Sequence, residues 1–255
     1  MNTYNPVTAV IRPTCNCVGL DEYAYATAHP LVRGRLPLTS PSLINPPARP
    51  LDELMACYAA GTLSAPLQCL VATHLAIKPE NRAFVSAMED MCGKAMCEVP
   101  AGPVRDRDAK LAAIFDHCAA EPAAAAIKCP IVPAPLSQLL GKKVTDLQWR
   151  RRLPGIKEFE LSQADGGEAK LYWINPGRVM PSHTHEGSEV TLVLRGGFSD
   201  PTGHYRRGDI AIADAELDHH PRADDDEDCI CFAVIDAPLR LTGPVGRIVQ
   251  RFFGH

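Results

Sequence analysis

The spacing of apolar residues changes along the chain, on either side of a proline-rich segment at residues 120–135. Before that segment apolar residues recur every three or four positions, which is the period of a helix. After it they recur at every second position, which is the period of a strand. The 255 residues are enough for one or two domains and for a self-sufficient core. The pattern therefore predicts an α+β multidomain protein.

Four helices are expected in the first half of the chain, packed into a small bundle by their apolar faces. The fourth, for example, carries Leu111, Ile114, Phe115 and Cys118 on one side. The boundaries of these helices are marked by a capping serine, by a proline in a first turn and by a glycine at a helix end. The expected helices are Leu51 to Gly61, one capped by Ser64 with Pro66 in its first turn, Pro79 to about Gly93, and Asp106 to Ala119.

Short β-rich runs separated by Gly, Pro and Asp fill the second half. Many short strands with frequent turns predict a β-barrel or sandwich. The runs are Lys157 to Leu161, Ala169 to Ile174, Val190 to Leu194, Asp209 to Ala213, Cys229 to Ile235 and Arg247 to Phe252.

These patterns divide the chain into four parts. We expect residues 1–50 to form a proline-rich, partly ordered leader and residues 51–119 to form the helical domain. Residues 120–135 are a stiff linker rich in proline and alanine, and 136–255 are the β domain.

The composition excludes several classes of protein. A net charge of −4 argues against direct binding of nucleic acid. No apolar run approaches the roughly 20 residues that a membrane span needs, and the first residues do not resemble a signal peptide. We therefore expect a cytoplasmic protein whose ten cysteines are thiols or metal ligands.

The strongest chemical signal is a group of histidines and a glutamate in the β half. His183 and His185 are two residues apart, so on a strand they point to the same side, and Glu189 follows after a small-residue bend. His219, one hairpin further on, supplies a third imidazole, with its neighbour His220 as the alternative. Three imidazoles and a carboxylate can bind one divalent metal and leave coordination positions open. Zinc, iron, manganese, nickel and copper all suit these ligands.

The spacing around these residues resembles the two motifs of the cupin family. Its first motif is matched by Gly177, His183, His185, Glu189 and Gly196, and its second by Gly208 and His219. The rest of the second motif departs from the pattern, with Asp214, Glu216 and Ala223 at its Pro, Gly and Asn positions. The resemblance implies a jelly-roll β-barrel whose metal ligands are His183, His185, Glu189 and His219.

A second resemblance covers about four fifths of the chain, from Leu51 to Phe253. The chain is similar to the ChrR family of anti-sigma factors, which join a zinc-binding helical domain to a C-terminal cupin. The similar segments are Ala56 to Ser64, Leu70 to Leu75, Glu189 to Leu194, Gly208 to Ile210, Ala213 to His219, Asp228 to Cys231 and Asp236 to Arg240. The resemblance implies zinc as the cupin metal.

The helical half departs from this family at its zinc ligands. His74 is retained, but Lys78 and Asn81 stand at the two cysteine positions, and the upstream histidine position falls near Arg49. One ligand cannot hold a structural zinc ion, so no zinc is expected there. We expect His74 to be a partly buried helix residue and apolar packing to hold the helices.

Cys229 and Cys231 lie two apart in a β run, so both thiols face one side of a strand. Core packing explains such a pair. The alternative is a redox-sensing pair beside the metal site.

Three classes of function remain, of which the weakest is a metal-dependent binding module or a purely structural cupin. The ChrR resemblance implies a transcriptional regulator whose helices bind an extracytoplasmic-function sigma factor and whose cupin senses oxidants or a small-molecule ligand at its metal. The alternative is a cupin metalloenzyme, such as a dioxygenase, hydrolase or lyase, acting on a small molecule. The resemblance favours the regulator over the enzyme, and pairing of cupin barrels makes a homodimer an open alternative to a monomer.

Overall fold

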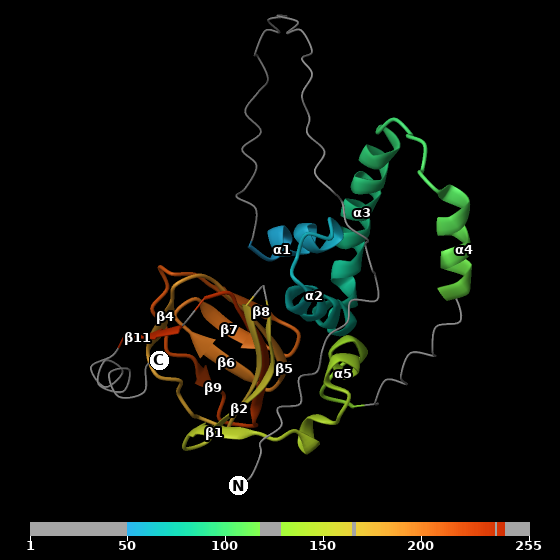
Figure 1. The fold of residues 1–255 in the computed structure, drawn as a ribbon. Coiled ribbons are helices and arrows are strands. Elements are labelled where there is room, and N and C mark those ends of the chain that lie inside the picture. Colours follow the sequence, from blue (N-terminus) through green and yellow to red (C-terminus); the bar gives the residue numbers. More distant parts are fainter. Residues whose placement is uncertain (1–49, 118–128, 165–166, 238, 243–255) are drawn as a thin grey trace, which may run out of the picture. The chain divides into compact units, whose positions relative to one another are not determined.

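The computed structural model of the chain describes residues 50–117, 129–164, 167–237 and 239–242. The leader predicted before Pro50 and the strand predicted at 247–252 lie outside these residues. Helices come first along the chain and strands follow, as the change of apolar period predicts (Figure 1). The α+β architecture is therefore confirmed, and the described elements all lie in one compact unit.

The first three helices share an apolar core. They are α1 (Pro50–Ala59), α2 (Ala65–Ile77) and α3 (Arg82–Cys97), with the 3₁₀ turn η1 (Pro79–Asn81) before α3. The core between them consists of Met55, Val71, Leu75 and Val85. Gly61 follows α1 at a φ of +70°, a left-handed conformation that glycine adopts without strain. Ser64 precedes α2, as predicted, although its side chain makes no capping hydrogen bond.

The later helices differ from the sequence prediction in two ways. α3 continues through Gly93 to Cys97 instead of ending near Gly93. A glycine inside a helix costs only about 1 kcal/mol relative to alanine, which is too little to end a helix by itself. α4 (Arg107–His117) lies where the fourth helix is predicted, but Leu111, Ile114 and Phe115 are exposed instead of packed in a bundle. Cys118 lies outside the described residues.

The described end of the predicted linker enters the protein core. Val132 is buried, and α5 (Ala134–Leu140) begins with Pro135 in its first turn and buries Leu136. The 3₁₀ turn η2 (Val144–Asp146) then leads into the first strand. Prolines at 133 and 135 therefore mark the start of a helix here.

The second half forms antiparallel sheets. The strands are β1 (Arg150–Leu153), β2 (Ile156–Ala164), β3 (Gly167–Ile174), β4 (His183–His185), β5 (Glu189–Arg195), β6 (Gly197–Asp200), β7 (Gly203–Arg206), β8 (Ile210–Ala213), β9 (Arg222–Ala223), β10 (Cys229–Ile235) and β11 (Leu239–Leu241). A six-stranded sheet has the order β1-β2-β3-β10-β5-β8, and β7-β6-β9 and β11-β4 form two smaller sheets. The five predicted runs that the structure describes coincide with β2, β3, β5, β8 and β10 to within a few residues.

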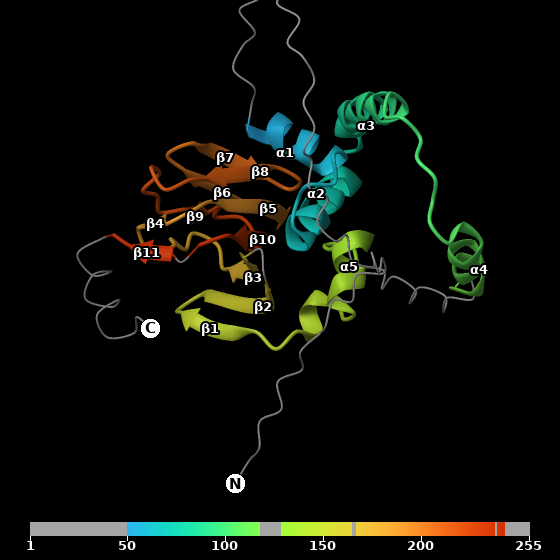
Figure 2. The same cartoon turned by 45° about the horizontal axis from the view of Figure 1, so that its top comes forward.

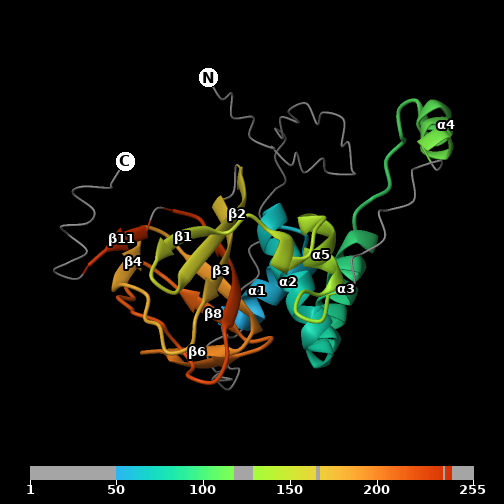
Figure 3. The ribbon, with the colours of Figure 1, turned by 90° about the horizontal axis from the view of Figure 1, so that it is seen from below.

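Strand β10 shows how the sheet is buried on both faces. All seven of its residues are buried, which explains why it is apolar throughout rather than alternating. Cys229 and Cys231 face a core inside the barrel, while Ile230 and Phe232 face a second core that includes Leu70 of α2. Figures 2 and 3 both show α2 and α5 beside the barrel on this side. The helices therefore share a core with the sheet.

Among the described residues, none of the helices has the length and apolar character needed to cross a membrane.

Candidate metal centre

Strand pairing brings the predicted histidines and glutamate together inside the barrel. β4 buries His183 and His185 on one face, with Thr184 between them turned the other way. Glu189 opens β5 after a short bend. His219 follows β8, and its backbone exchanges two hydrogen bonds of 3.0 Å with the backbone of His183. This backbone pairing brings His219 beside His183, although the two are distant in sequence.

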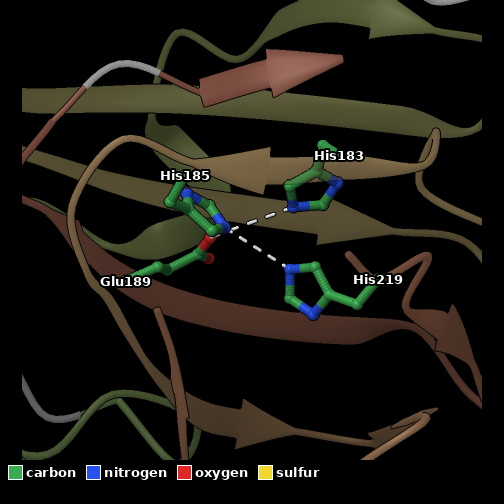
Figure 4. Close-up of side chains that lie close together, drawn as sticks. All are labelled: His183, His185, Glu189 and His219. Carbon is green, nitrogen blue, oxygen red and sulfur yellow. Dashed lines mark hydrogen bonds and ion pairs between the residues drawn. The ribbon is translucent and has the colours of Figure 1, made fainter. Parts of the chain in front are cut away.

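The four side chains offer one ligand atom each within 4.8 Å of one another (Figure 4). The Nε2 atom of His185 lies 2.8 Å from a carboxylate oxygen of Glu189 and 3.4 Å from Nε2 of His219. His183 Nε2 lies 4.0 Å from the same oxygen of Glu189. Three imidazole nitrogens and one carboxylate oxygen directed at one point are a donor set that zinc, iron, manganese and nickel accept. The residues present therefore fit a divalent metal ion.

Outer hydrogen bonds set the tautomers of two of the imidazoles. His183 Nδ1 lies 2.7 Å from the carbonyl of Pro181, and His219 Nδ1 lies 3.1 Å from a carboxylate oxygen of Asp200. Both partners only accept, so each Nδ1 carries the proton and each Nε2 keeps its lone pair toward the centre. The other oxygen of Asp200 accepts hydrogen bonds from the backbone and hydroxyl of Thr202 and from the backbone of Gly203.

The charges of the site match a cation between the side chains. Burial lowers the pKa of His183, which keeps the imidazole neutral and able to bind a metal. Burial raises the pKa of Glu189, but hydrogen bonds from His185 and Thr191 outweigh it and leave that pKa below its ordinary value. The pKa of Asp200 is lowered in the same way, since its hydrogen bonds with Thr202 and His219 outweigh its burial.

A cavity of about 50 Å³ opens beside these residues. Its wall is largely apolar. Three of the four residues line it, namely His183, Glu189 and His219, together with the polar side chains of Tyr172, Thr191 and Asp200. Burial raises the pKa of Tyr172, so this side chain stays a neutral phenol. A cavity of this size has room for a few water-sized molecules.

The chain is similar to a curated protein, the anti-sigma-E factor ChrR of Cereibacter sphaeroides. The two are 40% identical over 205 residues, which cover 79% of this chain and 95% of that protein. The chain belongs to the ChrR family. A family profile described as the ChrR cupin-like domain matches residues 137–237. A crystal structure of Rhodobacter sphaeroides SigE in complex with the anti-sigma ChrR matches with a TM-score of 0.63 and 37% identity, covering 72% of this chain and 96% of that one.

The match to the ChrR cupin-like domain agrees with the cupin resemblance of the sequence. The structure also distinguishes the two candidate histidines. His219 is buried in the four-residue group, whereas His220 is exposed and lies outside it. Sequence reasoning missed Asp200, because an aspartate before Pro-Thr-Gly is typical of a turn. Its side chain does hold that turn, and it also reaches His219.

The predicted cysteine pair lies at the edge of the cavity of this ChrR-family cupin. The sulfur atoms of Cys229 and Cys231 are 3.4 Å apart and buried, and Cys231 lines the cavity. Its hydrogen bond with Cys229 and its burial raise the pKa of Cys231, so the thiol is protonated at neutral pH.

His74, Lys78 and Asn81 stand at the positions where the ChrR resemblance implies zinc ligands. In this member of the family they form polar contacts with other protein groups. His74 is 2% exposed, its Nδ1 lies 2.7 Å from the carbonyl of Gly208, and its Nε2 lies 2.8 Å from the side-chain nitrogen of Asn81. Lys78 forms an ion pair of 3.4 Å with Asp209. Arg49 lies outside the described residues. Both nitrogens of His74 are thus occupied by protein groups, and the absence of zinc here stays a prediction.

Proposed function

We propose that this chain is an anti-sigma factor that binds an extracytoplasmic-function sigma factor and keeps it from RNA polymerase. The observation that carries the proposal is the 40% identity to an anti-sigma-E factor over 95% of that protein's length. Since RNA polymerase works in the cytoplasm, this is also where we place the chain.

Exposed apolar side chains on the helical half supply a surface for such a partner. Contiguous exposed apolar area is typical of protein interaction sites. Most of the large exposed apolar side chains in the described part of the chain fall within residues 91–115. They are Met91, Met96, Val99, Val104, Leu111, Ile114 and Phe115. We propose that this stretch of α3, α4 and their connection contacts the sigma factor.

For the barrel, we propose a sensor that holds one divalent metal ion through His183, His185, Glu189 and His219. Zinc is the metal that the ChrR resemblance implies, and iron, manganese and nickel fit the same donors. Bound there, the metal would act as a Lewis acid with open positions. The cavity of about 50 Å³ beside these residues has room for a small oxidant.

We propose Cys229 and Cys231 as a redox pair beside the same cavity, which Cys231 lines. An organic hydroperoxide would oxidise the two thiols to a disulfide: the O–O bond breaks, the sulfurs lose two protons and two electrons, and an alcohol and water form. The 3.4 Å separation of the sulfurs supports this step, and the raised pKa of Cys231 predicts that it is slow at neutral pH.

Co-expression with an extracytoplasmic-function sigma factor from the same genome tests the proposal. We expect the two chains to co-purify and transcription from that factor's promoters to fall. Replacing Ile114 and Phe115 together with aspartate should weaken the complex and leave the fold intact. Val179→Asp, at an exposed apolar position of the barrel that is 46% exposed, is the matched control and should bind normally.

The opposite result would favour an enzyme. If no sigma factor co-purifies and the metal-loaded protein turns over an added small molecule, the anti-sigma proposal is wrong and the cupin metalloenzyme is right.

A further inference from the structure

The turn between β7 and β8, residues 206–209, contacts the end of α2. The carbonyl of Gly208 accepts the hydrogen bond from His74 Nδ1 at 2.7 Å, and Asp209 pairs with Lys78 at 3.4 Å. His74 Nε2 then accepts a hydrogen bond of 2.8 Å from Asn81. Because His74 is buried and both its nitrogens are used, these contacts fix its ring against the turn.

The approach of this turn to α2 leaves no room for a side chain at position 208. A Cβ atom on Gly208 would lie 2.8 Å from Cγ2 of Ile77 and 2.7 Å from Cε of Lys78. Gly208 also has a φ of +89°, which favours glycine. The helix and the turn are therefore in direct contact at a backbone surface, in addition to their polar contacts.

The same turn is bonded to the strands of the metal centre. The backbone of Gly208 donates to the carbonyl of Val193 at 2.8 Å, and the backbone of Val193 donates to the carbonyl of Asp209 at 3.1 Å. Val193 belongs to β5, which begins at Glu189. β8 continues from the turn, lines the cavity, and pairs Ala213 with Glu189. Among the described strands β8 bonds only to β5 within its sheet, so one ladder restrains it.

Arg207 extends the turn's contacts to the chain segment that enters the barrel. Its guanidinium donates to the carbonyl of Ile131 at 2.9 Å, to that of Pro130 at 3.2 Å, and to that of Leu194 in β5. One turn thus contacts α2, the segment that precedes α5, and the strand that carries Glu189.

We propose that the 206–209 turn couples the metal centre to α2, so that occupancy of the centre changes how firmly the helix is held on the barrel. A shift of β5 and β8 on metal loss would move Gly208 and Asp209, the groups that hold His74 and Lys78. Coupling of this kind is reciprocal, so a partner that pulls α2 away would also weaken metal binding. The coupling itself does not require a sigma factor. Only its biological role, release of the sigma factor, rests on the proposed function.

Hydrogen–deuterium exchange of the full chain, without any sigma factor, tests the coupling. The backbone amides of α2, and that of Lys78, which bonds to the carbonyl of His74 at 2.7 Å, are compared with zinc bound and after chelation. Metal removal should speed their exchange by roughly 5- to 150-fold, the range of typical coupling between two sites. Amides of β10 serve as the internal reference for global unfolding. Equal exchange of α2 in both states would overturn the proposal.

Two variants sharpen the test. Gly208→Ala should keep its zinc, measured by elemental analysis, but exchange rapidly at α2 in both states. Gly141→Ala is the matched control, because Gly141 also has a positive φ of +60° but no atom within 4 Å of a Cβ. It should respond to the metal as the wild type does.

If Gly208→Ala does not fold, Asn81→Ala replaces it and should reduce the response at α2. A folded Gly208→Ala or Asn81→Ala that keeps the full metal response contradicts the coupling. Failure of a sigma factor to bind leaves these exchange results untouched, so the two proposals fail separately.

Discussion

Histidine is buried both in the barrel and in helix α2. The two sites differ in what the imidazole nitrogens contact. In the barrel, Nε2 of His185 lies 2.8 Å from a carboxylate oxygen of Glu189 and 3.4 Å from Nε2 of His219, so its neighbours are other members of the four-residue group. In α2, His74 donates from Nδ1 to Gly208 and accepts at Nε2 from Asn81. Burial of a histidine therefore does not by itself indicate a metal site. What indicates a metal site is several imidazole nitrogens and a carboxylate oxygen that face one another, as in the barrel.

The largest expected effect comes from removing two ligands of the barrel. The double variant His183→Ala, His185→Ala should lose its metal entirely. The loss should exceed the roughly 10- to 100-fold drop in affinity typical of removing a group that only orients a ligand. Elemental analysis of the purified protein measures it, with His220→Ala as the control because that exposed histidine lies outside the group. Metal retained at the wild-type level in the double variant would refute the assignment.

Removing the helical histidine should change stability instead of metal content. His74→Ala leaves the Gly208 carbonyl and the Asn81 amide without their partner and opens a cavity beside α2. Buried groups left unsatisfied cost about 1–3 kcal/mol each. Because the Asn81 bond is only partly buried, we expect the free energy of unfolding to fall by about 2–3 kcal/mol, the lower part of the summed range. Urea unfolding measures it. The exposed His204, paired with Asp224, supplies the control His204→Ala, which should change stability little. A loss of metal stoichiometry in His74→Ala at saturating zinc would contradict this contrast, because coupling through the 206–209 turn changes the affinity of the centre and not the number of metal ions that it holds.

Asp200→Asn tests whether a carboxylate orients His219. An asparagine presents one oxygen and one NH₂ group, so it cannot accept from His219 and from the Thr202 and Gly203 amides at once. We expect metal affinity to fall by roughly 10- to 100-fold, measured by competition with a chelator. Asp224→Asn alters a similar aspartate–histidine pair on the surface and should leave metal affinity unchanged. Unchanged affinity in Asp200→Asn would exclude the orienting role.

The two regions also differ in how far the sequence predicts them. The spacing of His183, His185 and Glu189 specifies the centre because strand periodicity places them on one face. His219 followed from a family motif, and the structure adds that it is a backbone partner of His183. Asp200 could not be predicted, since its link to His219 depends on where two strands meet.

In the helices, the sequence predicted the loss of zinc ligands but not what takes their place. Nothing in the spacing of His74, Lys78 and Asn81 indicates contact with Gly208 and Asp209, more than 120 residues away. The exposed face of α4 was misread as core, because an apolar helix face is the same pattern whether the protein or a partner covers it.

The pH dependence of stability provides a further contrast. Burial lowers the pKa of His74 in the folded protein, so the unfolded chain binds a proton that the folded chain does not. Stability from His74 is therefore complete above the ordinary histidine pKa of about 6.5 and is lost as the pH falls below it. One proton corresponds to a slope of at most about 1.4 kcal/mol per pH unit. Urea unfolding of zinc-saturated wild type and His74→Asn from pH 7.5 to 5 measures the difference. Parallel curves would contradict the shift.

The smallest effect on stability should come from Lys78→Ala, which removes the ion pair with Asp209. Both side chains are partly exposed, at 34% and 40%, and pairs of this kind contribute about 0.2–1 kcal/mol. Arg195→Ala removes a similar pair with Glu227, whose side chains are 40% and 43% exposed, so urea unfolding should not distinguish the two variants. Hydrogen exchange should, because Lys78, unlike Arg195, joins the end of α2 to the 206–209 turn. Lys78→Ala should reduce the response of α2 to metal removal, and Arg195→Ala should leave it at the wild-type level. A wild-type response in both variants would mean that the ion pair contributes to stability alone and that the coupling passes through His74 and Gly208.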